Sequence, residues 1–114
     1  MVKRATLLLV AMCCCSSAWS AGSVSGKVIQ VRVDKDGRGI VTFDTQVGGA
    51  PATCRHSAYT NALSFDANTH GGKAIMALAL AAKTSGSSVS AYGMGACSIY
   101  GGAWVEDWDY GVIL

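Results

Sequence analysis

The chain lacks any apolar run long enough to cross a membrane as a helix. Its longest apolar segment, residues 5–18, reads ATLLLVAMCCCSSA and is shorter than the roughly 20 residues that a spanning helix needs. Two positive residues precede it, and Ala18 and Ser20 place small side chains before a cleavage site. We therefore expect residues 1–20 to be a signal peptide, removed after Ser20, and the mature chain to be secreted or periplasmic. The alternatives are an uncleaved anchor and a lipoprotein attached through a cysteine of that segment.

A strong charge of either sign is also missing. The formal net charge of +2 comes from nine Lys/Arg and seven Asp/Glu, and Lys3 and Arg4 account for the excess. The mature chain, residues 21–114, is therefore formally neutral. A neutral surface gives no long-range attraction for nucleic acid or anionic lipid, so we expect neither as a partner. It also resists self-association only weakly, which suits an oligomer.

Cysteine becomes scarce once the signal peptide is removed. Three of the five cysteines lie in that segment, which leaves Cys54 and Cys97. Disulfides persist in exported proteins, so we expect these two to form one bridge. A closed loop of about 44 residues would stabilise the fold by roughly 4 kcal/mol in the loop-entropy model. A redox-active Cys-x-x-Cys pair is absent from the sequence, and Cys54 with His56 would supply only two metal ligands, so we expect no metal.

Sequence patterns that mark catalysis are missing as well. The chain has no Gly-x-Ser-x-Gly motif, and Gly-Gly-Lys at 71–73 does not have the Walker spacing. Glu106, Asp107 and Asp109 are close in sequence, with Asp107 and Asp109 on one face of a predicted strand. Carboxylates of this kind more often form a solvated face that protects a sheet edge. We therefore expect a binding protein without a cofactor and not an enzyme.

Residues 31–43 (VRVDKDGRGIVTF) place two acidic residues and two glycines between apolar strands. A calcium-binding loop is disfavoured, because Arg38 stands at the fifth ligand position and Thr45 at the twelfth. A hairpin explains the segment better. For its valines to share a face with Phe43, the loop must be odd in length or carry a bulge, for which Gly39 is the natural residue. The expected cross-strand pairs are Val33–Val41 and Val31–Phe43.

The remaining pattern predicts a mainly β fold with one central α-helix. Residues 21–26 are small and predict a flexible start, followed by a single domain over 27–114. Ala62–Phe65 and the segments after Gly86 alternate as strands do. Short strands, glycine bends and one interposed helix suggest a small, closed or partly closed barrel.

The predicted helix has clear ends and no polar side. Asn68 or Thr69 is the expected N-cap and Gly86 the C-cap, and residues 74–82 are all apolar. A helix that is apolar all round is buried on all sides, so we expect a second copy of the protein to cover the side that the sheet leaves free. Alternatively, the domain wraps the helix itself, or the outer alanines are exposed. The candidate interface residues are Ile75, Met76, Leu78, Ala79 and Leu80.

The order of elements and the segment TSGSSVSAY (84–92) resemble the OB-fold of pentameric toxin B subunits, such as the subtilase cytotoxin B subunit. The C-terminal segment 93–114, with its Gly-x-Cys-x-x-aromatic motif, is similar to that of short exported bacterial proteins of unknown function. The resemblance implies a small OB-fold-like barrel (β-β-β-α-β-β), a ring oligomer with the helix lining its centre, an exported enzymatic partner subunit and a glycan receptor. None of that family's sugar-binding residues maps onto a position here.

Aromatic residues are concentrated in the last quarter of the chain. Their faces can stack on sugar rings while neighbouring carboxylates accept hydroxyl hydrogen bonds. The candidate ligand-binding residues are Tyr92, Tyr100, Trp104, Asp107 and Trp108. The alternative is that these aromatics fill the core or a subunit interface. Two functions stay open: a toxin-B-like module that recognises a glycan or host surface molecule, and an envelope structural or interaction protein without a sugar site.

Overall fold

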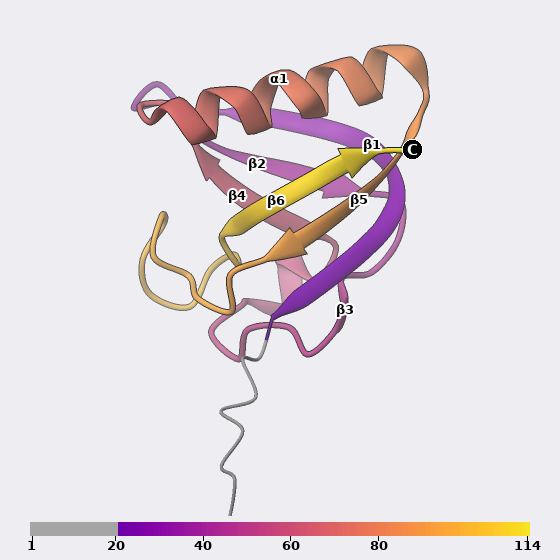
Figure 1. Cartoon of the computed structure of the whole chain (residues 1–114). Coiled ribbons are helices and arrows are strands. Elements are labelled where there is room, and N and C mark those ends of the chain that lie inside the picture. Colours follow the sequence, from indigo (N-terminus) through magenta and orange to yellow (C-terminus); the bar gives the residue numbers. More distant parts are fainter. Residues whose placement is uncertain (1–20) are drawn as a thin grey trace, which may run out of the picture.

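The computed structural model describes residues 21–114, so the predicted signal peptide lies outside the described residues (Figure 1). The fold is mainly β with one α-helix, as predicted from the sequence. The elements in chain order are β1 (Gly22–Val33), β2 (Arg38–Phe43), β3 (Gly48–Gly49), the 3-10 turn η1 (Ser57–Tyr59), β4 (Ala62–Asp66), α1 (His70–Ser85), β5 (Ser88–Gly93) and β6 (Trp108–Ile113).

The strands form one antiparallel sheet in the order β4-β2-β1-β5-β6, and β3 pairs with the start of β1. β1 is long enough to serve both halves of the sheet, because its first half pairs with β5 and its second half with β2. Within residues 21–114 the two outer strands do not pair along their length. The segment before β6 meets β4 only at a parallel bridge between Ser64 and Asp107. The sheet is therefore strongly curved (Figure 1) but is not closed into a barrel by a continuous ladder.

The prediction that residues 21–26 are flexible is wrong, because most of this segment is the start of β1. The strand begins at Gly22, Val24 is buried in the core, and Ser23–Lys27 pair with β5. Serine and glycine carry little strand propensity of their own. Pairing with a strand from the far end of the chain orders this segment, and that partner leaves no mark in the local sequence.

The β1–β2 hairpin has the odd loop that we predicted but a different register. Val31 pairs with Val41 and Val33 with Gly39, and the bulge lies at Ile29, between Val28 and Gln30. Gly39 has another role, because a Cβ there would overlap the Phe65 ring. The bulge turns Val28 and Val31 toward the core and leaves Ile29 exposed.

The helix α1 has the predicted ends. The Gly72 N–H donates to the Thr69 side chain at 2.9 Å, and Gly86 closes the C-terminus in the left-handed conformation, with φ of 69°. The helix lies across one side of the curved sheet (Figure 1) and packs on β1, β4 and β6. The core beneath it contains Phe43, Leu63, Phe65, Val89 and Trp108, among others.

In the single chain, α1 buries one side on the sheet and leaves the other side exposed, as expected for a helix whose free side a second copy would cover; the second copy itself stays a prediction. Ala79 is fully buried, and Ile75, Met76 and Leu78 pack partly against the core, so these residues serve the chain's own fold. Leu80 is 46% exposed, on a face otherwise made of exposed alanine, lysine and threonine. Among the described residues, no helix has the length and apolar character needed to cross a bilayer.

Candidate ligand-binding site

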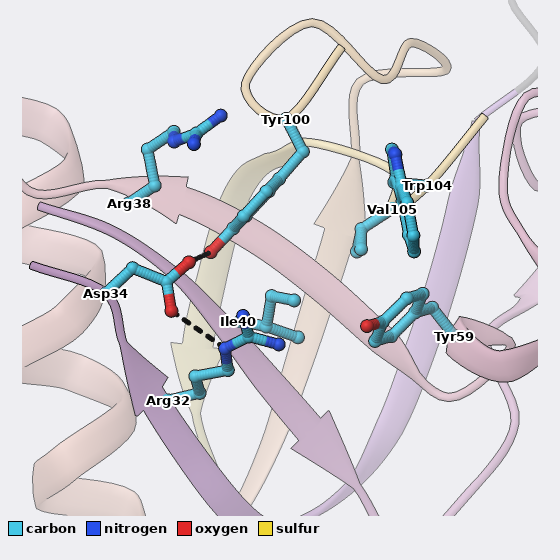
Figure 2. Close-up of a pocket in the computed structure, with 8 residues that line it drawn as sticks. All are labelled: Arg32, Asp34, Arg38, Ile40, Tyr59, Tyr100, Trp104 and Val105. Atoms are coloured by element: carbon cyan, nitrogen blue, oxygen red, sulfur yellow. Dashed lines mark hydrogen bonds and ion pairs between the residues drawn. The ribbon is translucent and has the colours of Figure 1, made fainter. Parts of the chain in front are cut away.

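A cavity of about 320 Å³ opens on the face of the sheet opposite the helix-covered core (Figure 2). Neighbouring residues of a strand point to opposite faces, so Ile40 lines this cavity while Val41 lies in the core. The lining residues are Arg32, Asp34, Arg38, Ile40, Tyr59, Tyr100, Trp104 and Val105. They come from the β1–β2 hairpin, from η1 and from the loop between β5 and β6.

One wall of the cavity is a hydrogen-bonded charged cluster. Asp34 accepts from the Arg32 Nε at 2.8 Å and from the Tyr100 hydroxyl at 2.6 Å (Figure 2). These bonds, from Tyr100 first and Arg32 second, hold the pKa of the Asp34 carboxyl below its usual range. Burial raises the pKa of Tyr100, and its bond to Asp34 adds to this effect. Asp34 is therefore a carboxylate at neutral pH and Tyr100 keeps its proton, so the wall has a fixed polarity.

Arg38 completes the same wall. Its Nε donates to Asp36 at 2.7 Å, and its guanidinium lies 4.7 Å from the centre of the Tyr100 ring. The backbone N–H of Arg38, followed by its side chain, lowers the pKa of the Asp36 carboxyl. The two acidic residues that suggested a calcium loop thus each have an arginine partner. Within residues 21–114, no group of three or more His, Cys, Asp or Glu side chains is placed to hold a metal ion.

The opposite wall is aromatic. Trp104 is 50% exposed and stacks on His56, with ring centres 5.9 Å apart, and the Tyr59 ring lies 6.0 Å from it. The backbone N–H of His56 also donates to the backbone carbonyl of Trp104 at 2.7 Å. The Ala58 N–H donates to the His56 Nδ1 at 3.0 Å, which makes that nitrogen an acceptor. The contacts with His56 and Tyr59 therefore hold the Trp104 indole in position, while its face stays accessible from the cavity.

The floor of the cavity is a small apolar cluster, separate from the main core. It consists of buried Ile40, Ala62 and Val105, against which Tyr59 and Tyr100 pack. Sheet and loop residues meet in this cluster. The floor thus contacts both walls, through Tyr100 on the charged side and Tyr59 on the aromatic side.

Two buried carboxylates hold the loops behind the floor. Glu106 is 1% exposed and accepts from the backbone N–H groups of Gly22, Ala52 and Gly95 at 2.8, 2.6 and 3.3 Å. Asp107 is 2% exposed and accepts from Ser98 and Ile99 N–H at 2.8 and 3.0 Å.

The prediction that Asp107 and Asp109 form a solvated face was therefore wrong for Asp107, and Glu106, which alternation placed on the other face of the strand, is buried as well. Only Asp109 is exposed. β6 begins at Trp108, so strand alternation does not apply to the two residues before it. Buried loop amides need acceptors, and these two side chains supply them.

The Cys54–Cys97 disulfide is confirmed, with a Cα–Cα distance of 6.1 Å. It joins the loop that leads into η1 to the loop that carries Tyr100 and Trp104. The covalent link therefore joins the two segments that supply the aromatic wall.

The structure separates the five predicted ligand-binding residues. Tyr100 and Trp104 line the cavity. Trp108 is 3% exposed and packs 5.6 Å from Phe43 in the core, and the Asp107 carboxylate is occupied by loop amides. Tyr92 lies elsewhere, on the outer face of β5, where it stacks on Tyr110 at 4.5 Å. Three of the five residues are thus not available to a ligand in this cavity.

Sequence reasoning missed Arg32, Asp34, Arg38, His56 and Tyr59. A signal for two of them was present, because a Cys54–Cys97 bridge brings the aromatic residues after Cys54 near those after Cys97. The hairpin residues had no such signal. Their role depends on Tyr100, which lies far along the chain.

Comparison of the chain with protein-family models, with curated proteins and with solved structures gives no significant match.

Proposed function

We propose that this protein is an exported binding module that holds a sugar residue of a glycan in the cavity. The observation that carries the proposal is the half-exposed Trp104, which faces a fixed cluster of charged side chains across an apolar floor. The disulfide supports an oxidising, extracytoplasmic location. The proposal is for binding without catalysis.

The chemistry of the two walls suits a sugar. A pyranose ring has an apolar C–H face, which stacks on Trp or Tyr, and a rim of hydroxyl groups that need donors and acceptors. Arg32 and Arg38 supply donors, and Asp34 supplies an acceptor. The lining holds two guanidinium groups and one carboxylate, so electron-rich oxygens are favoured over cations.

We also propose that the sheet is an OB-fold-like barrel of the kind found in pentameric toxin B subunits. Three observations support this proposal. β1 serves both halves of the sheet, the one α-helix of residues 21–114 lies between β4 and β5, and the Ser64–Asp107 bridge connects β4 to the segment just before β6. Fold alone does not determine function, so the glycan proposal depends on the cavity.

The first prediction concerns Trp104. Replacing it with alanine removes the stacking face and should weaken glycan binding about tenfold or more, since a lost aromatic contact of this size is worth roughly 1.5–3 kcal/mol. Ligands would be found on a glycan array and their affinities measured by titration calorimetry. The melting temperature should stay within about 3 °C of the wild type, because half of the indole is already exposed.

Tyr92→Ala is the matched control, because it removes an exposed aromatic ring outside the cavity. This variant should bind like the wild type. An array without signal from folded protein would contradict the glycan proposal, and equal losses in the two variants would contradict the assignment of the cavity.

The second prediction tests a ring oligomer. We propose that a second copy covers the outer face of α1, because Leu80 is exposed at the centre of a face that has no charge between Lys73 and Lys83. The native mass of the mature chain should be a multiple of the monomer, and Leu80→Glu should shift it to the monomer. Gln46→Glu, an exposed position after β2, should have no effect. A monomeric wild type would refute the assembly.

An interaction protein without a sugar site is the second candidate function. Exposed Tyr92, Tyr110 and Val112 lie outside the cavity, on β5 and β6, and such patches often mark protein contacts. This function would show as specific co-purification with another exported protein, lost in Tyr110→Ser and kept in Trp104→Ala.

A further inference from the structure

Glu106 is a buried carboxylate without a cationic partner in the described part of the chain. Its oxygens accept only the backbone N–H groups of Gly22, Ala52 and Gly95. Neither of the two ion pairs within residues 21–114 includes it. A carboxylic acid would need an acceptor for its own proton, so three donors indicate the ionised form. Buried charges are usually paired with an opposite charge as well as hydrogen-bonded.

The α-amine of the predicted mature N-terminus, at Ala21, is a cation close enough to pair with Glu106. The Gly22 N–H lies 2.8 Å from the Glu106 Oε2, and Gly22 would be the second residue of the mature chain. Backbone geometry keeps the nitrogen of Ala21 within about 3.6 Å of the Gly22 nitrogen, and so within about 6.4 Å of that oxygen. The Ala21 carbonyl accepts from the Ala50 N–H at 3.2 Å, which holds this residue in place.

We propose that removal of the signal peptide completes the Glu106 site. Hydrolysis of the Ser20–Ala21 bond by an export peptidase consumes one water and leaves a carboxylate on Ser20 and an α-ammonium on Ala21. This ammonium then lies next to Glu106 as its counter-charge. In the precursor the same nitrogen is a neutral amide and cannot play this role. The inference is independent of the glycan proposal and depends on cleavage after Ser20.

The consequence is a fold that becomes more stable when it matures. Glu106 connects β1 to both loops behind the cavity, through Ala52 on one loop and Gly95 on the other. A cation at Ala21 therefore stabilises the start of β1 and the two loops together. The precursor lacks this contribution, so a chain that still carries its signal peptide is less firmly folded than the exported product.

The test compares the mature chain, residues 21–114, with the same chain carbamylated on its α-amine, the site confirmed by mass spectrometry. Both forms are made as wild type, as Glu106→Gln and as Asp109→Asn, the last being the control for an exposed carboxylate. Blocking the amine should lower the melting temperature by about 4 °C or more in the wild type and in Asp109→Asn. In Glu106→Gln, blocking the amine should lower the melting temperature by less than about 1 °C, because the substitution and the carbamylation remove the same interaction. Equal shifts in all three proteins, or none, would overturn the proposal.

A second measurement decides the question if Glu106→Gln does not fold. Cyanate reacts with the free amine and not with the ammonium, so pairing with Glu106 should slow carbamylation of Ala21. We expect a rate at least about fivefold lower in the folded wild type than in the same chain unfolded in guanidinium, since an opposite charge at this distance favours the charged form. Equal rates would refute the pairing.

Discussion

Replacing both Cys54 and Cys97 with serine is expected to lower the free energy of unfolding by about 4 kcal/mol. The two residues are 43 positions apart, so the bridge removes a large part of the freedom of the unfolded chain. A domain of this size has a total stability of roughly 5–15 kcal/mol. Removing the disulfide therefore takes away a large fraction of the total stability. The urea concentration at the midpoint of unfolding should fall in proportion.

Urea unfolding of the oxidised wild type, the reduced wild type and the double variant measures this contribution. The reduced wild type and the variant should agree, because both have lost only the cross-link. The loops behind the aromatic wall should also loosen, which hydrogen exchange at Ala52 and Gly95 would report. A variant within about 1 kcal/mol of the oxidised protein would show that the native loops are strained or that the unfolded chain is already compact.

The second large effect is expected from Gly93→Ala. A Cβ at this position would overlap the Glu106 carboxylate, so the end of β5 and the carboxylate cannot both keep their places. Displacing the carboxylate removes acceptors from up to three backbone N–H groups, two of them in buried bonds. Each unpaired buried group costs about 1–3 kcal/mol, so we expect the two buried groups to lower the free energy of unfolding by about 2–6 kcal/mol.

Gly71→Ala is the matched control for this substitution. Gly71 lies in the first turn of α1 and nothing comes within 4 Å of an added Cβ. Alanine there should be neutral or stabilise the protein by about 0.5–1 kcal/mol, because it suits a helix better than glycine does. Similar losses in the two variants would mean that the Glu106 site is not the cause.

The parts of the fold that the sequence predicted are those with local signals. The helix has its caps and apolar run within residues 68–86, β4 has a compact apolar alternation, and the disulfide followed from having only two cysteines in the mature chain. The start of β1 and the hairpin register depend on partners far along the chain. Gly39, for example, is explained by the Phe65 ring that covers it, and no local pattern shows that contact.

The candidate site was predicted only in part, for the same reason. Tyr100 and Trp104 stood out because aromatic residues gather near the C-terminus. Asp34 was considered as a calcium ligand, while its partners are Arg32 beside it and Tyr100, which is 66 residues away. Alternation placed Glu106 and Asp107 on opposite faces of a strand, but both residues lie just before the strand and accept hydrogen bonds from buried amides.

The shared strand β1 also has a consequence for the order of folding. Its first two residues pair with the short β3, but most of its first half pairs with β5, where Ser25 meets Ser90 across 65 residues of sequence. Pairings this distant are slow to form, since the intervening chain must first be brought into place. The leading strand of an exported chain would thus keep one edge unpaired until nearly the whole polypeptide had crossed the membrane. In the exported protein that we propose, we therefore expect the sheet to complete its pairing only after translocation.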